Sequence, residues 1–265
     1  MLREKTFFLF DIDGTVALGN SLLPGAAEFF PEIRSKGGQF VFITNNSTKS
    51  IADYIEKFRR MGVSTDPRNF VTASTASVGW LRRHAGGKTV YVLGTRSLIR
   101  ELQEHGIRVT ADPDAPDISF VLAAYDSELT YRKLADTCRI LQTRQVTFLA
   151  TNPDLVCPMP FGYVPDCGSI CRMLEHATGR VPRYIGKPST DMVEIALREN
   201  HFSKEETLVV GDRLYTDIAC GNAAGVETAL VLTGEAKRSD PQIRVYPPTY
   251  IFDSIKELEQ TWNMH

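Results

Sequence analysis

The sequence has little of what marks membrane proteins or nucleic-acid-binding proteins. No apolar stretch in its 265 residues approaches the length of a membrane span. Basic blocks are absent and the formal net charge is −2, which argues against a nucleic-acid or membrane partner. Because Met1–Lys5 runs straight into an apolar stretch, we expect no signal peptide and a cytoplasmic protein.

The cysteines and histidines also lack the spacings typical of disulfide frameworks and metal sites. The five cysteines are odd in number and form no C-x-x-C pair, so neither a disulfide framework nor a zinc site is expected. Cys167 and Cys171 lie one helical turn apart, and we interpret both as small buried apolar residues. The five histidines form no cluster, and no repeat or low-complexity tract occurs. A chain of this length with 43% hydrophobic residues can bury a large core in two domains.

Polar motifs follow three strand-like apolar runs. Near-continuous apolar runs are typical of strands buried on both faces of a parallel sheet, and ligands gather outside the carboxyl ends of such strands. The runs and the motifs after them are Thr6–Phe10 before Asp11-Ile12-Asp13-Gly14-Thr15, Gln39–Ile43 before Thr44-Asn45-Asn46, and Thr207–Val210 before Gly211-Asp212. The sequence therefore predicts one site at a single sheet edge.

These residue types suit magnesium-dependent phosphoryl transfer. A carboxylate can attack phosphorus and form an aspartyl phosphate, and Mg²⁺ is held by one or two carboxylates together with phosphate oxygens and water. Positioning and charge neutralisation carry most of such a reaction. We predict Asp11 as the nucleophile, Asp13 as the acid/base and Asp212 as a metal ligand. Thr44 and Lys187, the latter from Gly186-Lys187-Pro188, would hold the phosphate.

Each motif also has an ordinary structural interpretation. Asp11 and Asp13 match the first and third positions of a calcium loop, but Thr15, Val16 and Leu22 fail its fifth, sixth and twelfth positions. Thr44-Asn45-Asn46 would also cap a helix that begins near Lys49. Gly-Lys-Pro and Gly-Asp are common turns. Taken singly, all but the first motif favour the ordinary interpretation, whereas the ordered set favours a site.

The same motifs, with Thr216-Asp217 after Gly211-Asp212, resemble the four signatures of the haloacid dehalogenase superfamily. The closest likeness is to its NagD-like or p-nitrophenyl phosphatase branch, and it extends over nearly the whole chain. The resemblance implies attack by Asp11, proton transfer by Asp13, and Mg²⁺ bound by Asp11, the backbone carbonyl of Asp13 and Asp212. It implies that Asp217 orients a metal-bound water or Lys187, and that Asn45 contributes to substrate binding.

The segment between the second and third motifs is too long for one crossover connection. It contains further strand-like runs, at 89–93, 118–122 and 146–150, and helical stretches at 97–105, 130–142 and 168–177. We therefore predict an α/β fold, with a Rossmann-like doubly wound parallel core and an inserted α/β cap domain of the C2 type. The expected boundaries give a core of residues 1–84 and 181–265, with the cap at 85–180.

The inserted domain is expected to choose the substrate, because the core handles only the phosphoryl group. Members that resemble this chain place Tyr-Asp after the second cap strand, here Tyr125-Asp126, and the loop Asp154–Pro158 would also face the core. Stacking of Tyr125 on a substrate and an ordinary strand-end tyrosine are equally good interpretations. The resemblance also implies that such a cap can mediate a homodimer.

The expected activity is hydrolysis of phosphate monoesters of small metabolites, such as sugar phosphates, nucleotides or phosphorylated cofactors, with p-nitrophenyl phosphate as an artificial substrate. Two alternatives stay open. One is a phosphotransferase of the same fold, which passes the phosphoryl group to a second alcohol. The other is a receiver-like signalling module that is phosphorylated on Asp11 without turnover, although a receiver needs neither Asp13 nor a cap.

Overall fold

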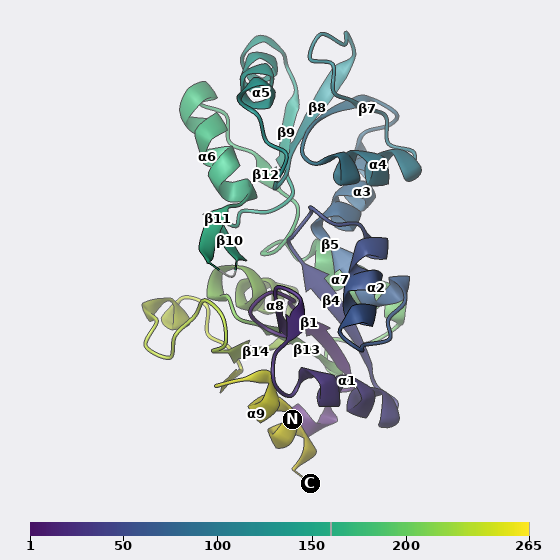
Figure 1. The fold of residues 1–265 in the computed structure, drawn as a ribbon, viewed down its shortest axis with the longest axis vertical. Coiled ribbons are helices and arrows are strands. Elements are labelled where there is room, and N and C mark those ends of the chain that lie inside the picture. Colours follow the sequence, from purple (N-terminus) through teal and green to yellow (C-terminus); the bar gives the residue numbers. More distant parts are fainter. Residues whose placement is uncertain (160, 265) are drawn as a thin grey trace. The chain divides into compact units, whose positions relative to one another are not determined.

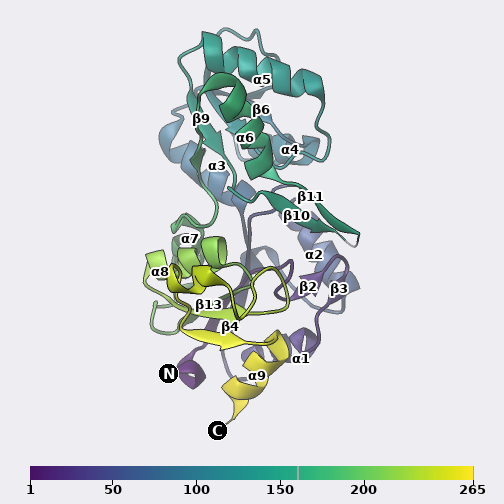
Figure 2. The same cartoon turned by 90° about the vertical axis from the view of Figure 1, so that its left-hand side faces the viewer.

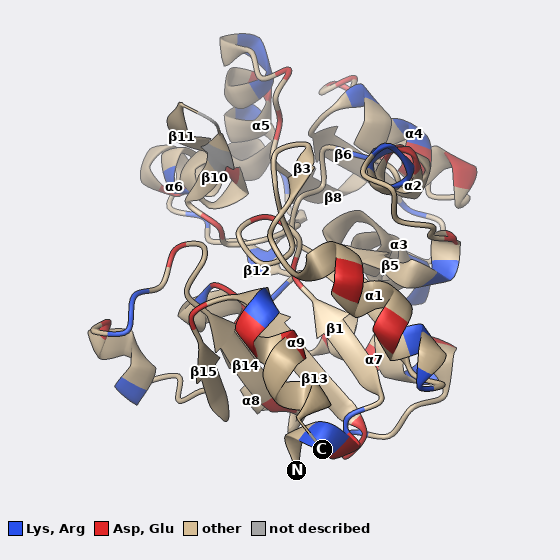
Figure 3. Ribbon diagram, turned by 60° about the horizontal axis from the view of Figure 1, so that its bottom comes forward, with Lys and Arg blue, Asp and Glu red and all other residues tan. Residues whose placement is uncertain are grey.

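The computed structural model of the protein describes residues 1–159 and 161–264. Its chain folds into two compact units, of which the first comprises residues 1–44, 51–71 and 187–265 and the second residues 45–50 and 72–186. In the described part of the chain, no helix is both long and apolar enough to cross a lipid bilayer. Lys and Arg bands interleave with Asp and Glu bands along the helices (Figure 3), as the small net charge suggests.

The first unit is built on a six-stranded sheet in the order β15-β14-β13-β1-β4-β5, in which β15, β14, β13, β1 and β4 run parallel. Its strands are β1 (Phe7–Phe10), β4 (Gln39–Thr44), β5 (Phe70–Thr72), β13 (Thr207–Gly211), β14 (Glu227–Val231) and β15 (Tyr250–Phe252). Its helices are α1 (Ala26–Ser35), α2 (Ile51–Arg60), α7 (Asp191–Asn200), α8 (Ala219–Ala224) and α9 (Ile255–Asn263). A short hairpin of β2 (Ala17–Leu18) and β3 (Ser21–Leu22) follows β1.

Aromatic side chains dominate one face of this sheet. Phe8, Phe10, Phe40 and Phe42 alternate along β1 and β4 and pack against α1, α2 and α9. Helices α7 and α8 pack on the opposite face. There the ring of Phe7 stacks on that of Phe202, which follows α7. Both faces are therefore buried, which explains why β1 is apolar at every position.

The second unit has its own five-stranded parallel sheet, in the order β12-β9-β8-β6-β7. Its strands are β6 (Thr89–Leu93), β7 (Val109–Thr110), β8 (Ile118–Ala123), β9 (Thr147–Ala150) and β12 (Arg183–Tyr184), and its helices are α3 (Ala73–His84), α4 (Arg96–Glu104), α5 (Tyr131–Thr143) and α6 (Cys167–Thr178). Helices α5 and α6 lie on one side of the sheet and α3 and α4 on the other (Figure 1). An antiparallel hairpin of β10 (Val156–Met159) and β11 (Gly162–Pro165) projects from this unit (Figure 2).

The predicted α/β class with a parallel core sheet is confirmed, and so are the six predicted strands and three predicted helices, each to within about one residue. The helix expected near Lys49 begins at Ile51, because Asn46 instead accepts hydrogen bonds from the backbone and hydroxyl of Thr48 in a preceding turn. Cys167 and Cys171 are buried in the core of the second unit, as predicted.

The two compact units divide at other residues than the predicted domain boundaries at 85 and 180. Helix α3 and residues 181–186 group with the second unit. The contacts of Trp80 explain this grouping, because its ring packs edge-on against Phe120 of β8 and lies under the guanidinium of Arg183. The turn-rich sequence around residues 84–87 therefore connects two elements of the same unit.

Candidate active site

Neighbouring strands of the first unit deliver polar residues to one edge of the sheet. Phe10 of β1 aligns with Val210 of β13 on one side and with Phe42 of β4 on the other. Because the strands are parallel, the residues that follow them leave the sheet at the same edge. Asp11 follows β1, Asp212 follows β13, and Thr44 is the last residue of β4.

The segment after β1 makes a tight turn. The backbone N–H of Asp11 still bonds to the Val210 carbonyl at 2.8 Å, and the chain then turns at Gly14, whose φ is 94°. The Gly14 N–H donates to the carbonyl of Ala17 at 2.9 Å. A side chain at Gly14 would be strained by this backbone conformation and would lie 2.7 Å from an oxygen of Asp212.

Lys187 is buried and bonds to three parts of the first unit. Its Nζ donates to Asp11 Oδ1 at 2.6 Å, to Asp217 Oδ1 at 2.5 Å and to the Ile43 carbonyl at 2.8 Å. Burial by itself lowers the pKa of the Lys187 ammonium, but the charges of Asp11 and Asp217 outweigh burial and raise it. Lys187 is therefore a fixed positive charge beside Asp11, and its peptide bond to Pro188 is cis.

A π-helical turn brings Asp217 back to the end of β13. The turn covers Leu214–Ile218, directly after Asp212 and Arg213. The Asp217 carboxylate bonds to Lys187 through Oδ1 and accepts the Arg213 N–H through Oδ2 at 3.1 Å. Both of its oxygens are engaged, so Asp217 is well placed to orient Lys187. π-turns of this kind recur at functional sites.

Asp11, Asp212 and Asp217 form an acidic cluster, with one oxygen of each lying within 4.8 Å of the others. Burial, followed by the charges of Asp11 and Asp217, raises the pKa of Asp212 well above its usual range. Burial also raises the pKa of Asp217 to about 6, although Lys187 acts in the opposite direction. One ammonium cannot neutralise three carboxylates, and a hard divalent cation suits such an oxygen donor set.

The acid/base candidate Asp13 lies outside this cluster. Its side chain is 25% exposed, and its Oδ1 lies 3.6 Å from Nζ of Lys57 on α2. The predicted contribution of Asp13 to the metal site comes from its backbone carbonyl and not from its side chain. Thr44, the predicted phosphate clamp, is buried at the end of β4.

Two predicted substrate-binding residues belong to the second unit. The Asn45 carbonyl accepts a hydrogen bond from the Asn152 amide at 2.7 Å, and both residues are buried. Tyr125 is partly buried against the core of this unit. Burial and then the neighbouring Cys157 raise the pKa of the Tyr125 phenol to about 12. Of the loop expected at 154–158, residues from Val156 onward form strand β10.

A fourth strand end, that of β14, was not predicted and also contributes to the site in the first unit. The segment Thr233–Glu235 follows β14, and its backbone N–H at Glu235 donates to Asp212 Oδ2 at 2.8 Å. The Thr233 hydroxyl donates to the Gly14 carbonyl at 2.7 Å. Glu235 also forms an ion pair with Arg213 at 3.0 Å. The sequence carries a signal for this segment, since Thr233-Gly234 follows an apolar run just as the other motifs do.

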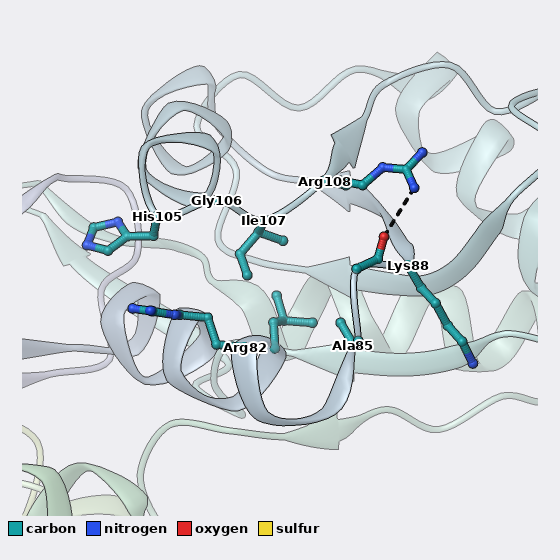
Figure 4. A pocket seen from close by; sticks show the side chains of 10 residues that line it. Arg82, Ala85, Lys88, His105, Gly106, Ile107 and Arg108 are labelled. Carbon is teal, nitrogen blue, oxygen red and sulfur yellow. Dashed lines mark hydrogen bonds between the residues drawn. The ribbon is translucent and has the colours of Figure 1, made fainter.

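A cavity of about 290 Å³ lies in the second unit between α3, α4 and β7. Leu81, Ala85 and Ile107 line its apolar interior, and Arg82 and Arg108 lie at its rim (Figure 4). None of the residues predicted for the reaction lines it. The Lys88 and Arg108 side chains point in different directions, and Arg108 bonds to the Gly87 carbonyl at 3.2 Å. The cavity therefore does not present converging charges.

Family models match most of the first unit and part of the second. A model described as haloacid dehalogenase-like hydrolase matches residues 8–108, and a related model of haloacid-dehalogenase-hydrolase-like proteins matches residues 184–258. The two ranges contain the acidic cluster, Lys187 and the segment Thr233–Glu235.

Three similar proteins illustrate the relationship. The acid sugar phosphatase of Staphylococcus aureus (strain MRSA252) is 34% identical over 98% of this chain and 100% of its own length. The structure of a 4-nitrophenylphosphatase from Thermotoga maritima has a TM-score of 0.89 at 36% identity, over 98% of both chains. That of a glycerol phosphate phosphatase from Mycobacterium tuberculosis in complex with magnesium has a TM-score of 0.88 at 29% identity, over 98% of this chain and 78% of that chain.

Proposed function

Because the chain belongs to the haloacid dehalogenase-like hydrolases, in their NagD-like and p-nitrophenyl phosphatase branch, and is a phosphatase of that type, we propose a specific reaction for it. It hydrolyses phosphate monoesters of small metabolites through an aspartyl phosphate on Asp11, with Mg²⁺ as cofactor. The observation that carries this proposal is the contact of Lys187 with Asp11 and Asp217, next to Asp212, in one buried cluster.

The first step uses Asp11 and Asp13. Lys187 holds Oδ1 of Asp11, and the other carboxylate oxygen attacks phosphorus. As the bond between phosphorus and the ester oxygen breaks, Asp13 donates a proton to that oxygen and an alcohol leaves. In the second step, Asp13 takes a proton from water while the water oxygen attacks phosphorus. The aspartyl phosphate is cleaved, inorganic phosphate leaves, and both aspartates return to their initial states.

The donor set fits a divalent cation. Two of the three clustered carboxylates have raised pKa values, so their negative charges are poorly compensated by protein groups alone. Asp11 and Asp212 would hold the ion, with the Asp13 carbonyl as a further ligand. Bound there, Mg²⁺ would neutralise charge on the phosphoryl oxygens. The related glycerol phosphate phosphatase has been crystallised with magnesium and with calcium, which supports a divalent cation at such a site.

Thr44 and Lys187 are proposed to hold the phosphoryl oxygens. Thr44 ends the strand next to β1, and the Lys187 ammonium is fixed by three hydrogen bonds. A charge that is fixed before the substrate arrives needs no reorganisation in the transition state. Asn45 remains a proposed contributor to substrate binding.

Sugar phosphates and related alkyl phosphates are the proposed substrates. The names of the similar proteins, acid sugar phosphatase and glycerol phosphate phosphatase, support this class.

Transfer of the phosphoryl group to another alcohol uses the same residues, so product analysis separates a phosphotransferase from a hydrolase. A receiver-like role is not supported by membership in a family of hydrolases. The cytoplasmic location and the homodimer stay predictions, and light scattering against the 29.6 kDa of one chain tests the dimer.

The Asp11→Asn variant tests the reaction. With p-nitrophenyl phosphate and Mg²⁺, we expect kcat to fall by at least about a thousandfold, because the amide cannot attack phosphorus. Chelation of the metal should abolish turnover by the unaltered protein. Asp253→Asn is the matched control, since its side chain is 74% exposed and pairs only at the surface with Arg238. Full turnover by Asp11→Asn would contradict the proposal.

A further inference from the structure

Helix α2 has a lysine on its buried face. Tyr54 and Phe58 point into the core of the first unit, and Lys57 lies between them with only 8% of its side chain exposed. Three other charged residues of α2, Glu56, Arg59 and Arg60, pair with one another on the solvent side. A lysine is seldom buried unless a partner compensates its charge, so this position requires an explanation.

The charge of Lys57 faces Asp13. Its Nζ lies 3.6 Å from Asp13 Oδ1, which is beyond ordinary hydrogen-bond length but within the range of a strong Coulombic attraction in a partly buried place. The two side chains differ in solvent exposure, since that of Asp13 is 25% exposed and that of Lys57 only 8%. Lys57 therefore contacts Asp13 from inside the protein and leaves the carboxyl group accessible.

We propose that Lys57 is a positioning residue for Asp13. The inference rests on the proposed function, in which Asp13 must reach the ester oxygen as the bond to phosphorus breaks. Asp13 sits on a turn outside the acidic cluster, so the cluster does not orient its carboxylate. The Lys57 ammonium on helix α2 attracts the nearer oxygen of Asp13 toward one orientation, both when the carboxyl group carries its proton and after it has donated that proton. A misplacement of about 1 Å can cost a hundredfold in rate.

The proposal predicts a dependence on the leaving group. An alkyl phosphate releases an alkoxide, which needs the proton from Asp13, whereas p-nitrophenolate is a stable anion that leaves without it. A loss of Asp13 orientation should therefore affect alkyl phosphates selectively. The loss should appear in kcat/KM, which covers the steps through the first cleavage of the phosphate ester.

The test compares Lys57→Met with the unaltered enzyme on glycerol phosphate and p-nitrophenyl phosphate, both with Mg²⁺. We expect kcat/KM to fall on the order of 100-fold for glycerol phosphate and less than about fivefold for p-nitrophenyl phosphate. Lys57→Arg keeps the charge, so its ratio of the two kcat/KM values should lie nearer to that of the unaltered enzyme. Arg60→Met removes a cation from the solvent side of the same helix, and both values should stay within about twofold.

A second comparison separates positioning from general damage. In an Asp13→Asn background, Lys57→Met should cause no further loss on glycerol phosphate, because the two residues act through one contact. Melting of metal-free Lys57→Met should occur at the temperature of the unaltered protein or above, since methionine suits the apolar face of α2. If Lys57→Met does not fold, the Lys57→Arg variant decides. A ratio of its two kcat/KM values far from that of the unaltered enzyme would then overturn the inference.

Equal losses on both substrates, or an additive loss in the Asp13→Asn background, would overturn the role of Lys57. A raised KM for both substrates with unchanged kcat would also overturn it, because Lys57 would then bind substrate uniformly. None of these outcomes touches the proposed reaction. The proposed reaction is tested separately, and full turnover by Asp11→Asn would contradict it.

Discussion

At the scale of single residues, glycines determine how closely the chain packs around Asp212. A Cβ on Gly234 would lie 1.9 Å from Asp212 Oδ2, and one on Gly14 would lie 2.7 Å from the same atom. Distances below about 3 Å require something to move. The turn after β1 and the segment after β14 therefore both depend on the absence of a side chain.

Gly234→Ala should weaken Mg²⁺ binding. The added methyl group displaces the Asp212 carboxylate or separates it from the Glu235 N–H. We expect the dissociation constant for Mg²⁺, measured by calorimetry, to rise on the order of tenfold or more, in line with other changes around metal ligands. Gly79→Ala is the control, because a Cβ there meets only the end of Arg83 at 3.6 Å and alanine favours the helix. Unchanged Mg²⁺ affinity in Gly234→Ala would show that the site tolerates the methyl group.

The individual residues differ in how visible they are from sequence. Asp11, Asp13, Lys187 and Asp212 stand in short motifs whose residue types match a known chemistry. Lys57 stands in an ordinary helical pattern, where a lysine predicts an exposed position. Only the packing of α2 against the core shows that this lysine is buried.

At the scale of elements, the parallel strand ends and the π-turn assemble the acidic cluster. Register alone places Asp11 beside the end of β13. Asp217 is five residues further along the chain than Asp212, and the turn at Leu214–Ile218 returns its carboxylate to Lys187. The resulting cluster concentrates negative charge in a largely buried part of the protein.

This cluster should make the metal-free protein less stable as the pH rises. The pKa of Asp217 is about 6 in the folded protein against 3.8 for an ordinary aspartate, so the folded state keeps a proton that the unfolded chain releases. The destabilising contribution is therefore absent below about pH 4 and complete above about pH 6. We expect it to lower the free energy of unfolding by on the order of 2 to 3 kcal/mol across that window.

Urea titrations in EDTA at pH 4.5 and pH 7 measure this contribution. Asp217→Asn should show a smaller decrease in the free energy of unfolding than the unaltered protein, because its amide does not ionise. Mg²⁺ should raise stability more at pH 7 than at pH 4.5, since ionised carboxylates bind it better. Parallel pH dependences for the two proteins would contradict a raised pKa at Asp217.

At the scale of the whole molecule, two units with separate sheets divide the proposed tasks. The acidic cluster, Lys187 and the Lys57–Asp13 pair all lie in the first unit. Tyr125 and Asn45 lie in the second, together with the β10–β11 hairpin. We propose that the first unit performs the phosphoryl transfer and that the second selects the substrate.

Tyr125→Ala tests this division. We expect it to change the ranking of kcat/KM across a panel of sugar, nucleotide and cofactor phosphates, with changes of about tenfold for individual substrates. Turnover of p-nitrophenyl phosphate should persist, because the reacting groups belong to the first unit. Tyr131→Ala is a control tyrosine in the same unit, at the start of α5 and 85% exposed. An unchanged ranking in Tyr125→Ala would remove this residue from substrate selection.

The α/β class, the main strands and the residues of the four motifs follow from the amino-acid sequence alone. Those features depend on local pattern, because buried parallel strands are apolar throughout and their ends carry the chemistry. Three further features are visible only in the folded protein: α3 belongs with the second unit, Thr233–Glu235 contacts Asp212, and Lys57 faces Asp13. These features depend on contacts between segments far apart in the chain. Such contacts arise from side-chain packing and leave no periodic pattern in the local sequence.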